Sequence, residues 1–380
     1  MKKMIQNFCT GLLCFSITVV QAQLTLPPSG DNQVAEVTQF MGPVSITINY
    51  SSPNVHGPHG EDRTGHIWGE LVPYGLANLQ FGWSNESNPS PWRGGANMNT
   101  TIELSHDILV EGKKLKAGKY GLHFIPGSTE WMVIFSSNAD SWGSFFYKAD
   151  EDVLRVTVKP AANNFHEWLT YEFTDRQNDA AVVALMWENL QVPIQFKVEN
   201  ITTVYIDQIR KELRSDIGFN YMSWVDGANY CVQQNTNLTE ALTWANYAIE
   251  EPFFGRKNFT SLSCKANVLN ALGKTTQADS IMQVAINDPT ASMMDIHYYA
   301  RGLQAQKKNK EALEVFLINY KKTPTSPVTN LGLARGYSAN GDYKNALKYA
   351  KAAMQLNPDP QVKSTLENAV KLLEAGKDFN

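Results

Sequence analysis

Between Val34 and Val198, apolar and polar residues alternate with a period of two. The stretch Val44–Tyr50 places three aliphatic residues and a tyrosine on one side, and serine, threonine and asparagine on the other. Such alternation is typical of a β-strand with one buried face. Further segments of this kind are Thr100–Leu104, Lys119–Ile125, Trp131–Phe135, Val153–Val158, Leu169–Phe173, Val182–Trp187 and Ile194–Val198. Many short strands separated by turn-forming residues predict an all-β antiparallel sandwich or barrel over residues 30–198.

After residue 200 the same residue types return every 34 positions. Ala278, Ala312 and Ala346 are spaced in this way, and each has another alanine twelve positions before it. A proline closes each unit: Pro289, Pro324 and Pro358. Small alanines let antiparallel helices approach closely, and proline ends a helix because it has no N–H to donate. The pattern predicts an all-α array of stacked helix pairs.

This array resembles the tetratricopeptide repeat over about residues 220–360. An amphipathic helix near Thr202–Ile217 is expected to cap it, so we predict a tetratricopeptide-type solenoid over residues 200–380. The resemblance implies a concave groove that grips a peptide or another protein. We therefore expect an envelope protein or peptide as partner, although an array that only packs on its own N-terminal domain is the alternative.

The first 22 residues have the character of a secretory signal. Lys2 and Lys3 precede an uncharged apolar run, Phe8–Val20, and Ala22 is a small residue of the kind that signal peptidases accept. The run is short for a membrane span, which favours a cleavable signal peptide over residues 1–22. The mature protein would be periplasmic or otherwise exported and soluble, without a transmembrane anchor.

Charge and cysteine content narrow the function classes. Cleavage after Ala22 removes two of the 33 basic residues and none of the 37 acidic ones, so the net charge becomes −6. An acidic chain of this kind is not expected to bind nucleic acid.

After signal cleavage two cysteines remain, Cys231 and Cys264, about one repeat length apart. They could form a disulfide in an oxidising compartment or be two small buried thiols.

Several blocks of the β-rich half resemble a family known as domain of unknown function 2911. These blocks are His66–Gly75, Trp92–Asn97, Gly112–Tyr120, Ile125–Gly127 and Trp187–Asn189. The resemblance implies export from Gram-negative bacteria and frequent fusion to tetratricopeptide repeats, and it implies no activity. The chain departs from the family pattern by inserting Leu76–Pro91 and by carrying Met98 where an acidic residue often stands. Any site that used this acid would be weakened here.

The family blocks contain the strongest candidates for ligand binding. Trp92, Arg93 and Asn97 lie in a glycine-rich loop, and Glu70 and Tyr74 belong to the preceding block. An aromatic platform beside an arginine and an amide suits a sugar ring or a carboxylate. Alternatively Arg93 pairs with Glu70, and Asn97 caps the loop.

Histidines provide two further candidates. His123 is predicted on the less apolar face of its strand, where it could line a cleft as an acid or base or be a half-exposed sheet residue. His56, His59 and His66 lie in a loop with nearby carboxylates and could ligate a divalent metal, although a loop rich in glycine and proline is a poor scaffold for one. Apart from this loop we expect no cofactor.

No recognisable catalytic motif is present, so we expect a protein that is not an enzyme. There is no GxSxG elbow, and no second histidine follows His166-Glu167 at the spacing of a zinc protease. We therefore expect a non-catalytic envelope protein whose repeats bind a partner and whose β domain binds a small or glycan-like ligand or is structural. The alternative is a periplasmic hydrolase that uses a metal, or His123 with Glu70 or Arg93.

Overall fold

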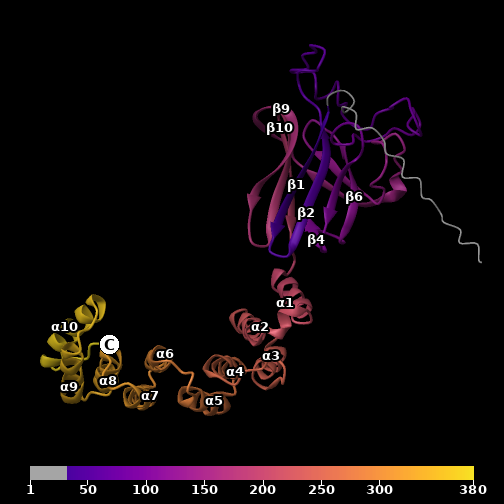
Figure 1. Cartoon of the computed structure of the whole chain (residues 1–380). Coiled ribbons are helices and arrows are strands. Elements are labelled where there is room, and N and C mark those ends of the chain that lie inside the picture. The colour runs from indigo at the N-terminus through magenta and orange to yellow at the C-terminus, as the bar shows by residue number, and fades with distance from the viewer. Residues whose placement is uncertain (1–31) are drawn as a thin grey trace, which may run out of the picture. The chain divides into compact units, whose positions relative to one another are not determined.

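The computed structural model describes residues 32–380. It divides into two compact units, one that runs to Ile201 and one that starts at Thr202 (Figure 1). The predicted signal peptide lies outside the described residues. No helix in the described part of the chain has the length and apolar character needed to cross a membrane.

The first unit contains a six-stranded antiparallel sheet in the order β1-β2-β3-β6-β7-β8. Its strands are β1 (Gln33–Met41), β2 (Val44–Ser52), β3 (Thr100–Leu104), β6 (Gly118–Ile125), β7 (Trp131–Ser136) and β8 (Asp152–Val158). The alternation seen in the sequence is real in β2, where Ile46, Ile48 and Tyr50 are buried and the residues between them are half-buried. β1 was not predicted, because its apolar residues occupy both faces: Val34 and Phe40 are largely exposed, whereas Val37 is half-buried and Met41 is buried.

A second antiparallel sheet has the order β5-β4-β10-β9. It consists of β4 (Ile108–Val110), β5 (Lys113–Leu115), β9 (Ala161–Arg176) and β10 (Ala180–Lys197). The predicted strands Val182–Trp187 and Ile194–Val198 are therefore parts of one long strand. Glu188 interrupts the alternation between them, because it has a positive φ of 53° and the register shifts on both sides of it.

The two sheets pack face to face, so the unit is a sandwich rather than a closed barrel. Tyr50 on β2 makes an edge contact with Tyr171 on β9, with ring centroids 4.9 Å apart. Phe135 on β7 contacts Phe196 on β10 in the same manner, at 6.5 Å. Each pair joins one sheet to the other, and all four side chains are buried. The predicted all-β antiparallel sandwich is confirmed.

The second unit contains ten α-helices, which follow one another in chain order along the array (Figure 1). They are α1 (Ile201–Glu212), α2 (Tyr221–Gln233), α3 (Leu238–Glu250), α4 (Phe259–Ala271), α5 (Thr275–Asn287), α6 (Met293–Ala305), α7 (Asn309–Lys322), α8 (Pro327–Ala339), α9 (Tyr343–Gln355) and α10 (Pro360–Glu374). The alanines that defined the repeat are fully buried where paired helices meet. The predicted tetratricopeptide-type solenoid is confirmed.

Turns between the helices of a pair repeat with the same period. Gly273, Lys307 and Gly341 each lie two residues after the end of α4, α6 and α8, and all three have positive φ angles. This left-handed conformation favours glycine, which has no Cβ. Lys307 therefore occupies a glycine position.

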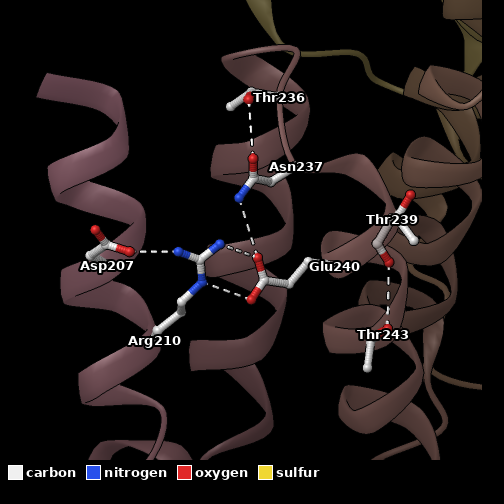
Figure 2. A network of polar contacts seen from close by, with 7 residues as sticks. All are labelled: Asp207, Arg210, Thr236, Asn237, Thr239, Glu240 and Thr243. Atoms are coloured by element: carbon white, nitrogen blue, oxygen red, sulfur yellow. Dashed lines mark hydrogen bonds and ion pairs between the residues drawn. The ribbon is translucent and has the colours of Figure 1, made fainter. Parts of the chain in front are cut away.

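The first helix is held to the array by a polar network. Arg210 on α1 donates from Nε and Nη2 to the two carboxylate oxygens of Glu240 on α3, at 2.8 and 2.6 Å. Its remaining terminal nitrogen bonds Asp207 on its own helix (Figure 2). Asn237 donates to the same Glu240 from the start of α3. This two-pronged ion pair fixes the orientation of α1.

Cys231 and Cys264 are both free thiols and both buried. They lie in the core shared by α1, α2, α3 and α4. Burial raises the pKa of the Cys264 thiol to about 12. Both therefore pack as small apolar side chains.

Candidate functional site

A pocket of about 490 Å³ opens in the β unit and is lined mainly by loop residues. Trp92, Arg93 and Asn97 contribute from the glycine-rich loop before β3, and His59 from the loop after β2. The loop after β7 adds Ser144, and β10 adds Trp187. The fold thus gathers into one cavity residues from widely separated parts of the chain.

Four tryptophans form one cluster, called here the tryptophan wall, of which Trp92 and Trp187 line the pocket. Trp68 makes edge contacts with Trp92, Trp131 and Trp187, with centroids between 5.3 and 5.9 Å apart. Trp92 also lies nearly parallel to Trp187 at 6.4 Å. The backbone of Trp92 exchanges two hydrogen bonds with Phe124 of β6, which fixes its position. Trp92 and Trp187 thus give the pocket a rigid aromatic lining of the type that packs against sugar rings or other flat ligands.

The buried indole of Trp187 carries an unused donor. This side chain is only 1% exposed, and its Nε1 has no hydrogen-bond partner in the part of the chain that the structure describes. Buried polar groups are normally paired with protein or with bound molecules. Trp187 lines the pocket, so an acceptor on a bound molecule could satisfy this N–H.

Arg93 is one of three charged residues that line the pocket, together with Glu61 and Arg63. Its Nη1 donates to the carbonyl of Asn97, and its guanidinium lies over the Phe145 ring at 4.8 Å. Gly143 makes room for it, since a Cβ there would come within 2.0 Å of Arg93 Cζ. Burial lowers the pKa of Arg93. Among residues 32–380 it forms no ion pair with a carboxylate, and Glu61, the carboxylate that also lines the pocket, interacts with Arg63 and His59 instead.

The loop that carries Arg93 is fixed by its glycines. Gly94 has a φ of 64°, and a Cβ there would lie 2.4 Å from the Phe124 ring. Its carbonyl accepts hydrogen bonds from Tyr171 Oη at 2.8 Å and Thr100 Oγ1 at 3.1 Å. Only glycine combines this backbone conformation with so close an approach.

His123 lies near Arg93 and is buried, with 2% exposure. The face of β6 that carries it was expected to be the less apolar one, but Leu122, His123 and Phe124 are all buried. The loop after β7 covers this face, and Ser144 from that loop bonds His123 Nδ1 at 2.9 Å. Burial and the nearby Arg93 charge lower the pKa of His123 to about 4. Its imidazole is therefore neutral at physiological pH.

Glu70 and Tyr74 do not line the pocket. Glu70 contacts His66 at 3.0 Å, so it is not the partner of Arg93. Tyr74 is 51% exposed and packs beside Gly69, where a Cβ would lie 2.8 Å from its ring. Of the predicted ligand-binding residues in the family blocks, Trp92, Arg93 and Asn97 thus line the pocket. Glu70 and Tyr74 lie outside it.

The histidines of the loop after β2 have separate partners. His56 Nδ1 contacts Glu167 Oε2 at 2.8 Å, and this contact raises the pKa of His56. His66 pairs with Glu70, while His59 lines the pocket. Within the described residues no group of three histidine, cysteine or acidic side chains is arranged to hold a metal ion.

Three residues in or near the pocket were not predicted from the sequence. Gly143 and Ser144 lie in a loop with no recognisable motif, and Glu188 was noted only as part of a family block. Glu188 is buried and accepts a hydrogen bond from the backbone of Gly65 at 2.5 Å, which anchors the loop before Trp68. Its charge inside an apolar strand was the one available signal.

The fold and the pocket define a class: a β-sandwich with a ligand-sized cavity, joined to a tetratricopeptide-type array. Residues 32–196 match the family model described as "Protein of unknown function (DUF2911)", which confirms the resemblance carried by the sequence blocks.

Solved structures similar to this chain include two helical proteins. One is titled "Crystal structure of YrrB: a TPR protein with an unusual peptide-binding site"; it is 17% identical, with coverage of 44% of this chain and 84% of that one and a TM-score of 0.30. The other, titled "MamA RS-1 ArsTM double mutant", is 16% identical, with coverage of 42% and 97% and a TM-score of 0.27. A comparison with curated proteins finds no match.

Proposed function

We propose that this protein is an exported, non-catalytic binding protein whose β domain holds a small ligand that carries a carboxylate, such as an acidic sugar. The observation that carries the proposal is Arg93, a half-buried cation that lines the pocket without a carboxylate partner among the described residues. Removing a cation from water is costly unless an anion compensates it. A ligand carboxylate at Arg93 would supply that anion, while the tryptophan wall packs against the ring.

Calorimetric titration of the purified protein with glucuronate and with glucose tests this proposal. The two sugars differ in the carboxylate, so we expect glucuronate to bind at least about tenfold more tightly, the effect of one charge-assisted hydrogen bond. Arg93→Gln should remove this preference. Arg176→Gln, which changes an exposed arginine on β9, is the matched control and should leave it intact. Equal affinity for the two sugars, unaffected by Arg93→Gln, would contradict the proposal.

The helical repeats are proposed to bind a partner protein or peptide of the envelope. A tetratricopeptide-type fold is generally used for protein–protein contact. The proposed domains are a signal peptide over residues 1–22, a β domain over 30–198 and a repeat domain over 200–380. Export is tested by the mass of the protein recovered from the periplasm of an expression host, which should begin after Ala22. Partner binding is tested by affinity capture from envelope extract.

A hydrolase at the same pocket is the second candidate, and the contact between Ser144 and His123 favours it. A serine hydroxyl bonded to a neutral imidazole is the beginning of a nucleophile–base pair. Against it, Ser144 and His123 are 1% and 2% exposed, and a pKa near 4 makes His123 a weak base. Incubation with phenylmethylsulfonyl fluoride and mass analysis distinguishes the two. Labelling at Ser144 supports the hydrolase, and an unlabelled Ser144 supports the binding protein.

A further inference from the structure

The last residues of the described chain return to the helical array. Gly376 follows α10 with a φ of 68°, and Lys377 donates its backbone N–H to Leu372 at 2.9 Å. This arrangement reverses the chain direction at the end of the helix. The next three residues, Asp378–Asn380, then contact α8 and α6, which lie 39 or more residues earlier in the sequence. We call Asp378–Asn380 the tail.

Each residue of the tail has a specific contact with α8. Ser338 Oγ donates to Asp378 Oδ1 at 2.6 Å, and the Phe379 backbone N–H reaches the same hydroxyl at 3.4 Å. The Phe379 ring lies 5.3 Å from the Arg335 guanidinium and packs against the hydrophobic cluster of the last helices. Asn380 donates to the Arg335 carbonyl at 3.0 Å. Main chain, aromatic ring and polar side chains all take part, as in peptide recognition.

The surface that the tail contacts is formed by equivalent positions of successive repeats. Arg301 and Arg335 are 34 residues apart, and so are Gln304 and Ser338, so each pair occupies equivalent positions on α6 and α8. Asn380 Oδ1 lies within 3.4–3.5 Å of Arg301, Gln304 and Arg335. The equivalent positions on α4 are Asn267 and Asn270, both exposed. A row of polar donors thus follows the first helices of successive repeats, and the tail covers only part of it.

Charge on this surface favours an acidic occupant. Arg301 and Arg335 form no ion pair with a carboxylate in residues 32–380. Burial and the nearby Arg301 charge lower the pKa of Arg335 to about 10, whereas Asp378 opposes this shift. His297 on the same helix as Arg301 is buried and has a pKa lowered to about 4, so it adds no charge of its own. The carboxylate of Asp378 is the compensating charge that the tail supplies.

We propose that Arg301, Gln304, Arg335 and Ser338 form a peptide-binding surface, and that the tail is its intramolecular occupant. A partner peptide in which an acidic residue is directly followed by an aromatic one would take the place of Asp378 and Phe379, so the tail limits access to the surface. This inference rests on the proposed partner binding by the repeats. It adds the chemistry of the partner segment and a means of regulating its binding.

A fluorescent peptide with the sequence of residues 375–380, closed by an amide, tests the proposal. Fluorescence anisotropy is measured against the full chain and against a chain that stops before Asp378. We expect at least tenfold tighter binding to the shortened chain, because the intramolecular competitor is gone. A peptide with asparagine and alanine in place of Asp378 and Phe379 should bind at least tenfold more weakly. Arg335→Gln in the shortened chain should weaken binding to a similar extent.

Circular dichroism establishes that the shortened chain remains folded. If it does not, Phe379→Ala in the full chain replaces it, because this change removes the ring and leaves the backbone in place. Undetectable peptide binding to the folded variant, or equal binding of the two peptides, would overturn the proposal. Equal affinities of the folded variant and the unaltered chain would overturn the regulatory part of it.

Capture from envelope extract separates this inference from the proposed function. A partner held equally by the full and shortened chains, and insensitive to Arg335→Gln, leaves partner binding standing but contradicts the assigned surface. Peptide binding that increases when the tail is removed and decreases in Arg335→Gln, without any captured partner, supports the surface and counts against the envelope partner.

Discussion

The two units of this chain are stabilised by contacts of different range. In the β unit, the tryptophan wall joins Trp68, Trp92, Trp131 and Trp187, which are spread over more than a hundred residues. In the helical unit, buried alanines recur at 34-residue intervals, and helices pack mainly on their neighbours. A sandwich core is shared by all its strands, whereas a repeat array is a series of similar interfaces. A core substitution should therefore destabilise the whole β unit, whereas one in the helical unit should destabilise mainly its own repeat.

The largest expected effect comes from the shared tryptophan wall. Trp131 is 1% exposed and contacts Trp68, Trp92 and Phe124. Trp131→Ala should lower the free energy of unfolding of the β unit by about 4 kcal/mol, because it leaves a large cavity. Trp142→Ala, at a 51% exposed tryptophan, is the control and should change little. Both are measured by urea denaturation followed by circular dichroism, and similar losses in the two variants would contradict the shared core.

A glycine of the pocket loop should be the next most sensitive position. Gly94→Ala places a Cβ against the Phe124 ring in a left-handed conformation, so we expect a loss of about 3 kcal/mol. Gly112 has a similar φ of 77° but nothing within 4 Å of a Cβ, and Gly112→Ala should cost only about 1 kcal/mol. The difference between the two variants in thermal denaturation isolates the steric contribution from the backbone strain.

A substitution in a repeat turn should increase stability. Lys307 has a φ of 62° at the position where Gly273 and Gly341 stand in the neighbouring repeats. Lys307→Gly should stabilise the helical unit by about 1 kcal/mol through relief of the left-handed strain. Gly341→Ala should destabilise it by a similar amount. Denaturant midpoints measure both, and a loss of stability in Lys307→Gly would show that the repeats are not equivalent at this turn.

The smallest effect is expected at the ion pair of Figure 2. Arg210 lowers the pKa of Glu240, so the pair stabilises the fold above the ordinary pKa of a glutamate, and this contribution disappears as the pH falls through the lowered value. The side chains are 39% and 33% exposed, and screening by water limits the effect of Glu240→Gln to about 0.5 kcal/mol. Stability measured at pH 7 and at pH 3 should show the difference between variant and parent only at pH 7.

Local patterns made much of the architecture predictable. The strand over Val44–Tyr50 was predictable because alternating apolar residues indicate one buried face. The helix pairs were predictable because the regularly spaced alanines are the buried contacts between helices. The prediction was incomplete where local pattern and environment differ. β1 has apolar residues on both its exposed and its half-buried face, so it lacks a clear alternation, and the register shifts at Glu188 divide the pattern of β10 in two.

For the site, the sequence alone identified Trp92, Arg93 and Asn97 as a set, since they are neighbours in one loop. It could not assign their surroundings, because Gly143, Ser144 and Trp187 are brought to Arg93 by strand pairing over distances of 50 residues or more. It also offered Glu70 as a partner for Arg93, whereas the fold pairs Glu70 with His66.

The sequence by itself determined the two kinds of unit, since period-two and 34-residue patterns are properties of neighbouring residues and adjacent helices. Only the tertiary structure decided that His123 is buried, that Arg93 lines a pocket without a carboxylate partner among the described residues, and that the tail lies on Arg335. These facts depend on which distant segments cover a given face, and no local pattern records that choice.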